Sequence, residues 1–149
     1  MEEGMMTEGP ALASYISGSL GRDISDIRTY SPLTLAYIGD AVYDLWIRTY
    51  IVAGGQVSPD KLHKRATKYV SAVAQAKIVT AIEKELTEDE ADMLRRGRNA
   101  KPHTTAKNAS VADYHTATGL ECLIGYLYLK GDTDRITRII GEGIKAIGK

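Results

Sequence analysis

The sequence predicts an all-α domain of about six or seven helices, and three observations lead to this prediction. Ser-Pro pairs, single serines and threonines, and a Thr-x-x-Glu box recur where helices would begin. Between these starts, apolar residues repeat every three or four positions. No segment alternates apolar and polar residues as a half-buried strand would.

An N-terminal extension over residues 1–21 is expected to be poorly ordered, because it mixes Gly, Met, Glu and Ser and ends in a glycine-rich stretch. It leaves room for one short helix, at 11–17. The folded domain is expected to occupy residues 22–149, and the whole chain of 149 residues has a length typical of a single domain.

Four helices are predicted in the next part of the chain, each after a capping residue. In the first two, a proline follows the N-cap serine directly, as the first helical position allows. In the fourth, Thr87 and Glu90 have the spacing of a capping box. The predicted ranges are 32–53, 59–69, 72–82 and 88–96.

A loop and two long helices complete the domain. Residues 99–109 contain Pro102, two threonines and two lysines, and they are expected to form the loop. Ser110 can cap a helix that ends before Gly131, and Thr133 opens the last helix. That helix carries isoleucines at helical spacing: Ile136, Ile139, Ile140, Ile144 and Ile147.

The composition excludes several classes of protein. Lysine and arginine number 19, as do aspartate and glutamate, so a uniformly basic nucleic-acid coat is excluded. The single cysteine, Cys122, excludes a disulfide within the chain and a cysteine zinc cluster. No apolar stretch approaches the ~18 residues of a membrane span, and Glu2 and Glu3 stand where a secretory signal would be basic. We therefore expect a cytoplasmic protein.

The helix predicted over 32–53 carries an unusual line of charge. Its charged residues are Asp40, Asp44 and Arg48, and their spacing places them on one narrow stripe. One interpretation is an exposed Asp44–Arg48 ion pair, which leaves Asp40 without a partner. The other positions are largely apolar, so we expect this helix to be central or to lie at a subunit contact.

A second lone acid, Glu121, lies in the hydrophobic half of the helix predicted over 111–129. It shares a stripe with Ala117, Thr118 and Gly125, whose small side chains would let another helix approach closely. The two helices therefore suggest a pair of carboxylates at a helix contact. Such a pair cannot stay ionised without a cation. One cysteine and three histidines favour oxygen-ligated Mg²⁺ over zinc.

Charge is segregated along the neutral chain. Residues 60–68 hold four basic residues and one acid, and residues 95–107 hold five basic residues and no acid. Residues 83–92 hold six acids and one lysine, and they are expected to form a solvated face. Lysines and arginines near a scissile bond would contact phosphates, and few aromatic residues favour recognition of duplex RNA by shape. The predicted RNA contacts are Arg95, Arg96, Arg98, Lys101 and Lys107, with Lys61 and Lys64.

Four motifs, in order, resemble the ribonuclease III family. Leu-Ala-Tyr-Ile-Gly-Asp-Ala-Val-Tyr-Asp-Leu at 35–45 resembles the signature helix of its catalytic domain, and Leu-Glu-Cys-Leu-Ile-Gly-Tyr-Leu-Tyr-Leu at 120–129 resembles its second acidic helix. The segments 62–72 and 95–101 are similar to the short branch, Mini-ribonuclease III. The resemblance extends from residue 23 to the end, where no double-stranded-RNA-binding domain follows.

The resemblance implies a helical bundle of the ribonuclease III endonuclease type, working as a symmetric homodimer that cuts double-stranded RNA and leaves 5′-phosphate ends. Asp40 and Glu121 would be the catalytic residues and the Mg²⁺ ligands. Full-length members carry two further acids, at positions that are Ala36 and Thr118 here. Asp44, which could join the site through a water, and Thr118 are candidates for contacting these ligands without binding the metal directly.

The resemblance to the Mini branch also implies a role in maturing precursor 23S ribosomal RNA. The residues identify no protein helper, ribosomal or other. The alternative is a non-catalytic RNA-binding or scaffold protein that retains the fold after losing two acids. A helical phosphohydrolase acting on nucleotides is disfavoured, because the chain lacks an adjacent His–Asp pair.

Overall fold

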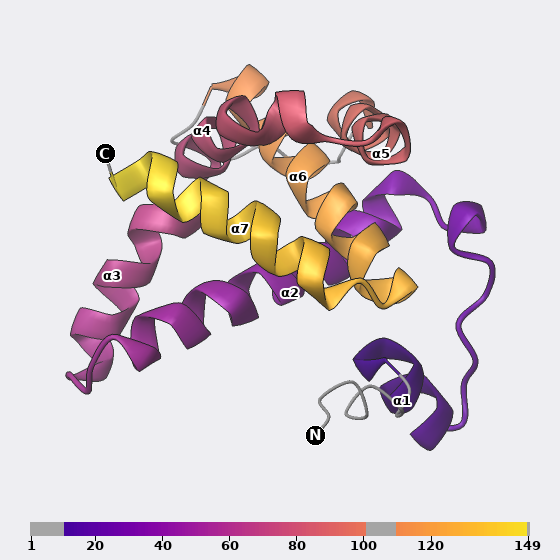
Figure 1. Ribbon diagram of the computed structural model, residues 1–149, viewed down its shortest axis with the longest axis horizontal. Coiled ribbons are helices and arrows are strands. Elements are labelled where there is room, and N and C mark those ends of the chain that lie inside the picture. Colours follow the sequence, from indigo (N-terminus) through magenta and orange to yellow (C-terminus); the bar gives the residue numbers. More distant parts are fainter. Residues whose placement is uncertain (1–10, 101–109, 149) are drawn as a thin grey trace, which may run out of the picture.

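The computed structural model describes residues 11–100 and 110–148, and every regular element in these ranges is a helix (Figure 1). The predicted all-α class is confirmed. No helix within these ranges has the length and apolar character needed to cross a membrane. In chain order the elements are α1 (Leu12–Ser19), η2 (Ile27–Thr29), α2 (Pro32–Ala53), α3 (Pro59–Val70), α4 (Ala72–Ile82), η3 (Glu83–Glu85), α5 (Glu88–Asn99), α6 (Val111–Lys130) and α7 (Thr133–Gly148).

The helix starts follow from the capping residues that the sequence predicted. The serine before each of α2, α3, α4 and α6 accepts a hydrogen bond from a backbone N–H three residues later. Thr87 and Glu90 form the reciprocal capping box of α5. Gly131 ends α6 with φ of 88°, a left-handed conformation that glycine adopts without strain.

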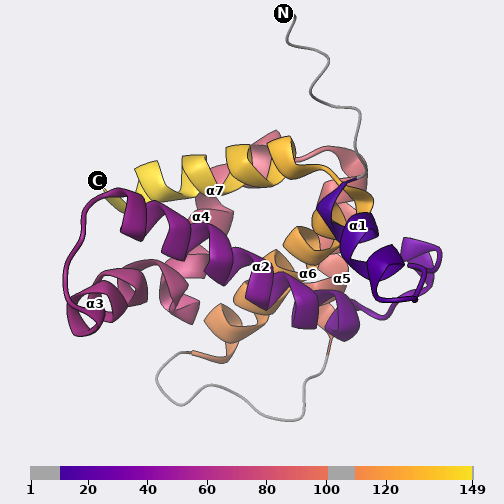
Figure 2. The same ribbon diagram turned by 90° about the horizontal axis from the view of Figure 1, so that it is seen from below.

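Helix α6 runs through the middle of the molecule, and α2 crosses it (Figures 1 and 2). Glycines allow the close approach: a Cβ added at Gly39 would lie 2.8 Å from the backbone nitrogen of Gly125, and one added at Gly125 would lie 2.8 Å from the carbonyl carbon of Leu35. Gly125, one of the small residues on the Glu121 stripe, therefore lies at a close helix contact. Helices α4, α5 and α7 cover the remaining faces of α6.

Helix α5 continues to Asn99, three residues beyond its predicted end at Arg96. The extra turn packs against α6, where Gly97 and Gly119 face each other: a Cβ added at Gly97 would lie 2.8 Å from the Cα of Gly119. This contact between distant segments extends the helix, and local sequence signals do not report it. The rest of the predicted loop, residues 101–109, lies outside the described residues.

The N-terminal extension contains a packed helix. Helix α1 occupies the place of the short helix that the sequence allowed at 11–17, and its Ala13 is buried. Ala11 approaches Gly131 closely enough that an added Cβ there would lie 2.8 Å away. The boundary at residue 22 stays a prediction, and residues 1–10 lie outside the described part of the chain.

The acidic segment 83–92 is not a solvated face throughout, as the sequence had suggested. Glu90 is only 5% exposed and receives two hydrogen bonds from the Arg135 guanidinium, at 2.7 and 2.8 Å. Burial would raise the pKa of Glu90, but the bonds from Arg135 and Thr87 hold it below its usual value. This ion pair joins α5 to α7.

Candidate active site at the α2–α6 crossing

The crossing of α2 and α6 brings Asp40 and Glu121 side by side. Gly39, next to Asp40, packs directly on the backbone of Glu121, so the two carboxylates leave their helices at the point of closest approach. Asp40 is exposed and borders a hollow in the surface, which Asp44 also lines, whereas Glu121 is partly buried. The pair that the sequence suggested is therefore present.

The surroundings of Glu121 disfavour its negative charge. Burial first, and then the neighbouring charge of Asp40, raise the pKa of Glu121 from 4.5 to about 8, and a hydrogen bond from Gln75 opposes the rise. The pKa of Tyr43 is also raised, mainly by burial and further by Glu121. A positive charge placed between the carboxylates would relieve this repulsion.

Gln75 is a member of the site that the sequence analysis missed. Its side-chain amide nitrogen donates to Oε2 of Glu121 at 3.3 Å and to the backbone oxygen of Val70 at 3.1 Å. It is uncharged, so a search for acids and bases passes over it. A signal was present, because Gln75 lies at helical spacing with the buried Ile78, Val79 and Ile82, where a polar side chain needs a reason.

The two predicted supporting residues have partners of their own. Asp44 pairs with Arg48, Oδ2 to Nε at 2.9 Å, which is the simpler of the two interpretations of this stripe. Thr118 is buried beside the crossing and donates its hydroxyl hydrogen to the backbone oxygen of Tyr114 at 3.1 Å. Neither contact involves Asp40 or Glu121.

The donor set fits a cation that takes few protein ligands. Within residues 11–100 and 110–148, no group of three or more His, Cys, Asp or Glu side chains is arranged to hold a metal. In the same ranges, no lysine or arginine forms an ion pair with Asp40 or Glu121. Two adjacent carboxylates, one of them open to solvent, suit a hard divalent cation that keeps several waters.

Comparison with known proteins identifies the family of the chain. Residues 33–132 match the family model described as the ribonuclease III domain. The chain belongs to the ribonuclease III family. It is 48% identical to a Mini-ribonuclease 3 from Enterococcus faecalis, over 83% of this chain and 96% of the relative. It is 42% identical to one from Staphylococcus aureus, over 83% and 93% of the two chains.

A solved structure shares the fold of this ribonuclease III-family chain. The crystal structure of a protein from Fusobacterium nucleatum superposes with a TM-score of 0.75 at 35% identity, covering 82% of this chain and 99% of the other. The relatives identify the branch as Mini-ribonuclease 3. The predicted resemblance is confirmed, and the chain is an endoribonuclease.

The basic segments of this ribonuclease III-family chain lie at opposite ends of the molecule, on α3 and α5 (Figures 1 and 2). On α5, Arg95 pairs with Asp92, and Arg98 lies 3.5 Å from Oε2 of Glu83. The other predicted contacts on these helices are Arg96, beside Met93, Lys64, paired with Asp60, and the exposed Lys61. Lys101 and Lys107 lie outside the described residues.

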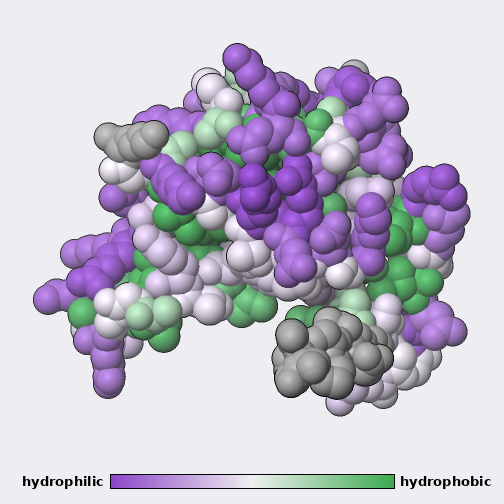
Figure 3. Space-filling view, viewed as in Figure 1, coloured by the Kyte–Doolittle hydropathy of each residue, from purple (hydrophilic) through white to green (hydrophobic). Residues whose placement is uncertain are grey.

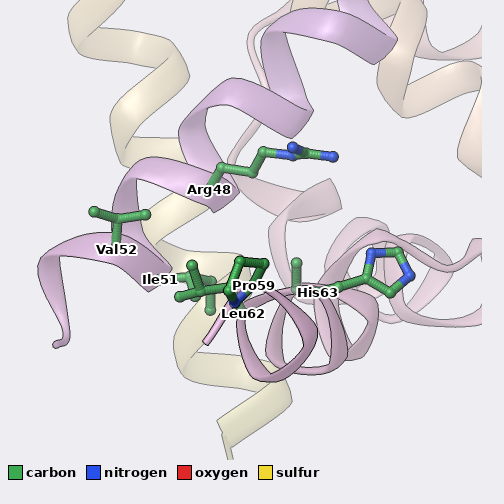
Figure 4. Close-up of a pocket in the computed structure, with 7 residues that line it drawn as sticks. Arg48, Ile51, Val52, Pro59, Leu62 and His63 are labelled. Carbon is green, nitrogen blue, oxygen red and sulfur yellow. The ribbon is translucent and has the colours of Figure 1, made fainter. Parts of the chain in front are cut away.

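A separate pocket lies between α2 and α3 (Figure 4). Arg48 and His63 line it together with apolar side chains that include Ile51 and Leu62. Arg48 is about two helical turns beyond Asp40, and no carboxylate lines the pocket. The pocket is therefore distinct from the carboxylate site.

Proposed function

We propose that this chain cleaves double-stranded RNA with Mg²⁺ held between Asp40 and Glu121, as a cytoplasmic homodimer that matures precursor 23S ribosomal RNA. One observation carries the proposal: the two carboxylates lie side by side at the α2–α6 crossing, without a described lysine or arginine paired to either. Membership of the ribonuclease III family supports it.

Asp40 and Glu121 divide the work of the site. When bound, Mg²⁺ would supply positive charge at the scissile phosphate and promote ionisation of the attacking water. Glu121 is partly buried and held by Gln75, so it fixes the inner side of the site. Asp40 faces the surface hollow, where a phosphate can approach. Ala36 and Thr118 bring no charge, so waters and the phosphate would complete the coordination of a bound ion.

The basic residues on α3 and α5 would contact the phosphate backbone. The arginines of α5 and the lysines of α3 are too far apart to hold one phosphate, which suits contacts along a duplex. Their ion pairs are exposed and easily exchanged for phosphate. The proposed contacts remain Arg95, Arg96, Arg98, Lys101, Lys107, Lys61 and Lys64.

Exposed apolar side chains on α2 support the homodimer. Leu45 is 53% exposed, and Tyr50 is also exposed. Both line a groove between α2 and α7, to which Leu12 of α1 also contributes. Hydrophobic residues are visible below α7 and beside α1 (Figure 3). A second copy of the chain can cover such a face by a two-fold contact, which uses the same patch on both subunits.

Cleavage of a long RNA duplex with and without Mg²⁺ tests the proposal. We expect Mg²⁺-dependent cutting by the wild-type chain and only a small residual rate in Asp40→Asn, which should still fold and bind duplex. Lys84→Gln, a change at a lysine outside the site, should cut normally. Cutting by Asp40→Asn at the wild-type rate would overturn the site. Binding without any cutting would favour a non-catalytic RNA-binding protein.

The ribosomal substrate and the cytoplasmic location need their own tests. We expect faster cutting of the stem of precursor 23S RNA than of an unrelated duplex of equal length, and accumulation of the uncut precursor in cells that lack the protein. Equal rates on both duplexes would contradict the substrate. A cytoplasmic location agrees with Cys122, a buried cysteine that forms no disulfide.

A further inference from the structure

We propose that Gln75 is a positioning residue for the carboxylate pair, and that its side-chain amide holds Glu121 in the orientation that faces Asp40. The inference rests on the proposed function, because it assigns Gln75 a role in the binding of the divalent cation. Gln75 touches neither substrate nor reacting atoms in this role, and it acts through Glu121.

The position of Gln75 is fixed from several sides. It is 3% exposed and begins the buried stripe of α4. Its backbone N–H donates to the backbone oxygen of Ser71, the N-cap of α4, at 2.9 Å. The hydroxyl of Tyr43 on α2 donates to the backbone oxygen of Tyr69 at 2.7 Å and so ties the end of α3 to α2. An amide held in this way can set the direction of the carboxylate that it contacts.

Both hydrogens of the Gln75 amide are used. One points to Oε2 of Glu121 and the other to the backbone oxygen of Val70. Reversing the amide would place its oxygen against these two acceptors, so only the observed orientation makes both bonds. It leaves the buried Oε1 of Gln75 without a partner in the described part of the chain.

The unpartnered oxygen is informative, because a buried acceptor without a hydrogen bond lowers stability. An apolar side chain of the same length would fill this place in the core without that penalty. The glutamine thus serves the two acceptors rather than the packing. Of these, Glu121 is the one with a role in the proposed chemistry.

Loss of the Gln75 amide should weaken the site without unfolding it. Partners that orient metal ligands typically contribute about 10- to 100-fold to metal affinity or activity. We expect a loss of this size in cation affinity and a lower kcat at limiting Mg²⁺. The KM for RNA should change little, because the proposed phosphate contacts lie on other residues.

The test is Mn²⁺ binding to the RNA-free protein, followed by electron paramagnetic resonance, in the wild type and in Gln75→Met. Methionine keeps the unbranched length and removes both donors and the unpartnered oxygen. The control is Thr116→Val on α6, which removes a buried hydroxyl whose one hydrogen bond among the described residues goes to the backbone oxygen of Ala112. If Gln75→Met does not fold, Gln75→Leu replaces it as the test variant, because leucine also lacks the amide.

We expect Gln75→Met to bind Mn²⁺ about 10- to 100-fold more weakly, with a Tm close to that of the wild type and with cutting restored by excess Mg²⁺. Thr116→Val should bind Mn²⁺ normally. If the wild type binds Mn²⁺ and Gln75→Met binds it with equal affinity, this inference alone is overturned. A wild type that binds no Mn²⁺ would overturn the metal site and this inference together.

Discussion

Replacing Gly39 with alanine is expected to push apart the two helices that carry the carboxylates. The added Cβ would lie 2.8 Å from the backbone nitrogen of Gly125 and closer still to the carbonyl group of Glu121. Backbone atoms cannot turn aside as the end of a flexible side chain can. Helices α2 and α6 would therefore have to separate at the point where Asp40 and Glu121 meet.

The size of the effect follows from two opposing contributions. Overpacking of a core costs typically 1–3 kcal/mol, and contact with backbone puts this case near ~3 kcal/mol. Alanine would otherwise stabilise a helix interior by up to about 1 kcal/mol relative to glycine. We expect the free energy of unfolding to fall by about 2 kcal/mol, which lowers the Tm of a chain of this length by about 6 °C.

Urea denaturation followed by circular dichroism measures the change. The matched control is Gly18→Ala in α1, where an added Cβ meets nothing within 4 Å and should be neutral or slightly stabilising. Gly39→Ala should also cut RNA more slowly at limiting Mg²⁺. A Gly39→Ala variant as stable as the wild type would refute the close approach of α2 and α6.

Three further predictions concern pH, the buried ion pair and RNA binding. The stability that Glu121 contributes to the metal-free protein is present below its ordinary pKa of 4.5 and is lost as the pH rises toward about 8, because the folded state holds the proton more tightly. The urea concentration at the midpoint of unfolding should therefore decrease as the pH is raised from about 5 to about 8. Glu121→Gln should flatten this trend. Glu90→Gln keeps a residue that fits the capping box but removes the negative charge from the buried pair with Arg135. It should lower the free energy of unfolding by about 2 kcal/mol. The control Glu88→Gln, at an exposed position, should change the free energy of unfolding by under about 0.5 kcal/mol. Arg98→Gln should reduce the slope of log Kd against log salt concentration for duplex RNA by about 1, and Lys84→Gln should leave the slope unchanged.

Each of these predictions has an outcome that contradicts it. Midpoints that rise between pH 5 and pH 8 would mean that Glu121 is ionised without strain in the metal-free protein. Equal stability losses in the Glu90 and Glu88 variants would deny the importance of the buried pair. An unchanged salt slope in Arg98→Gln would remove this arginine from the RNA contacts.

Much of the fold could be predicted because helix starts are encoded locally. The serines before α2, α3, α4 and α6 and the Thr87–Glu90 box act on backbone groups within three residues, so the sequence reports them directly. The end of α5 could not be predicted in this way. It depends on Gly97 meeting Gly119, which lies on another helix.

The candidate site was predictable in part for a similar reason. An apolar helix that carries a lone acid is unusual, so Asp40 and Glu121 stand out among the residues of α2 and α6. The glycine at position 125 indicates a close neighbour. Gln75 does not stand out, because its role depends on a contact between α4 and α6. The burial of Glu90 was not predicted, since its partner Arg135 is distant in the sequence.

A double-mutant cycle on the rate of duplex cleavage tests most directly whether Asp40 and Glu121 act through one shared cation. The variants are Asp40→Asn, Glu121→Gln and the combination, each assayed at saturating RNA and Mg²⁺. If both carboxylates hold the same ion, removing the second should lower the cleavage rate little once the first is gone. The double variant should then cut no more slowly than the less active of the two single variants. Losses that multiply in the double variant would show that the two side chains act independently.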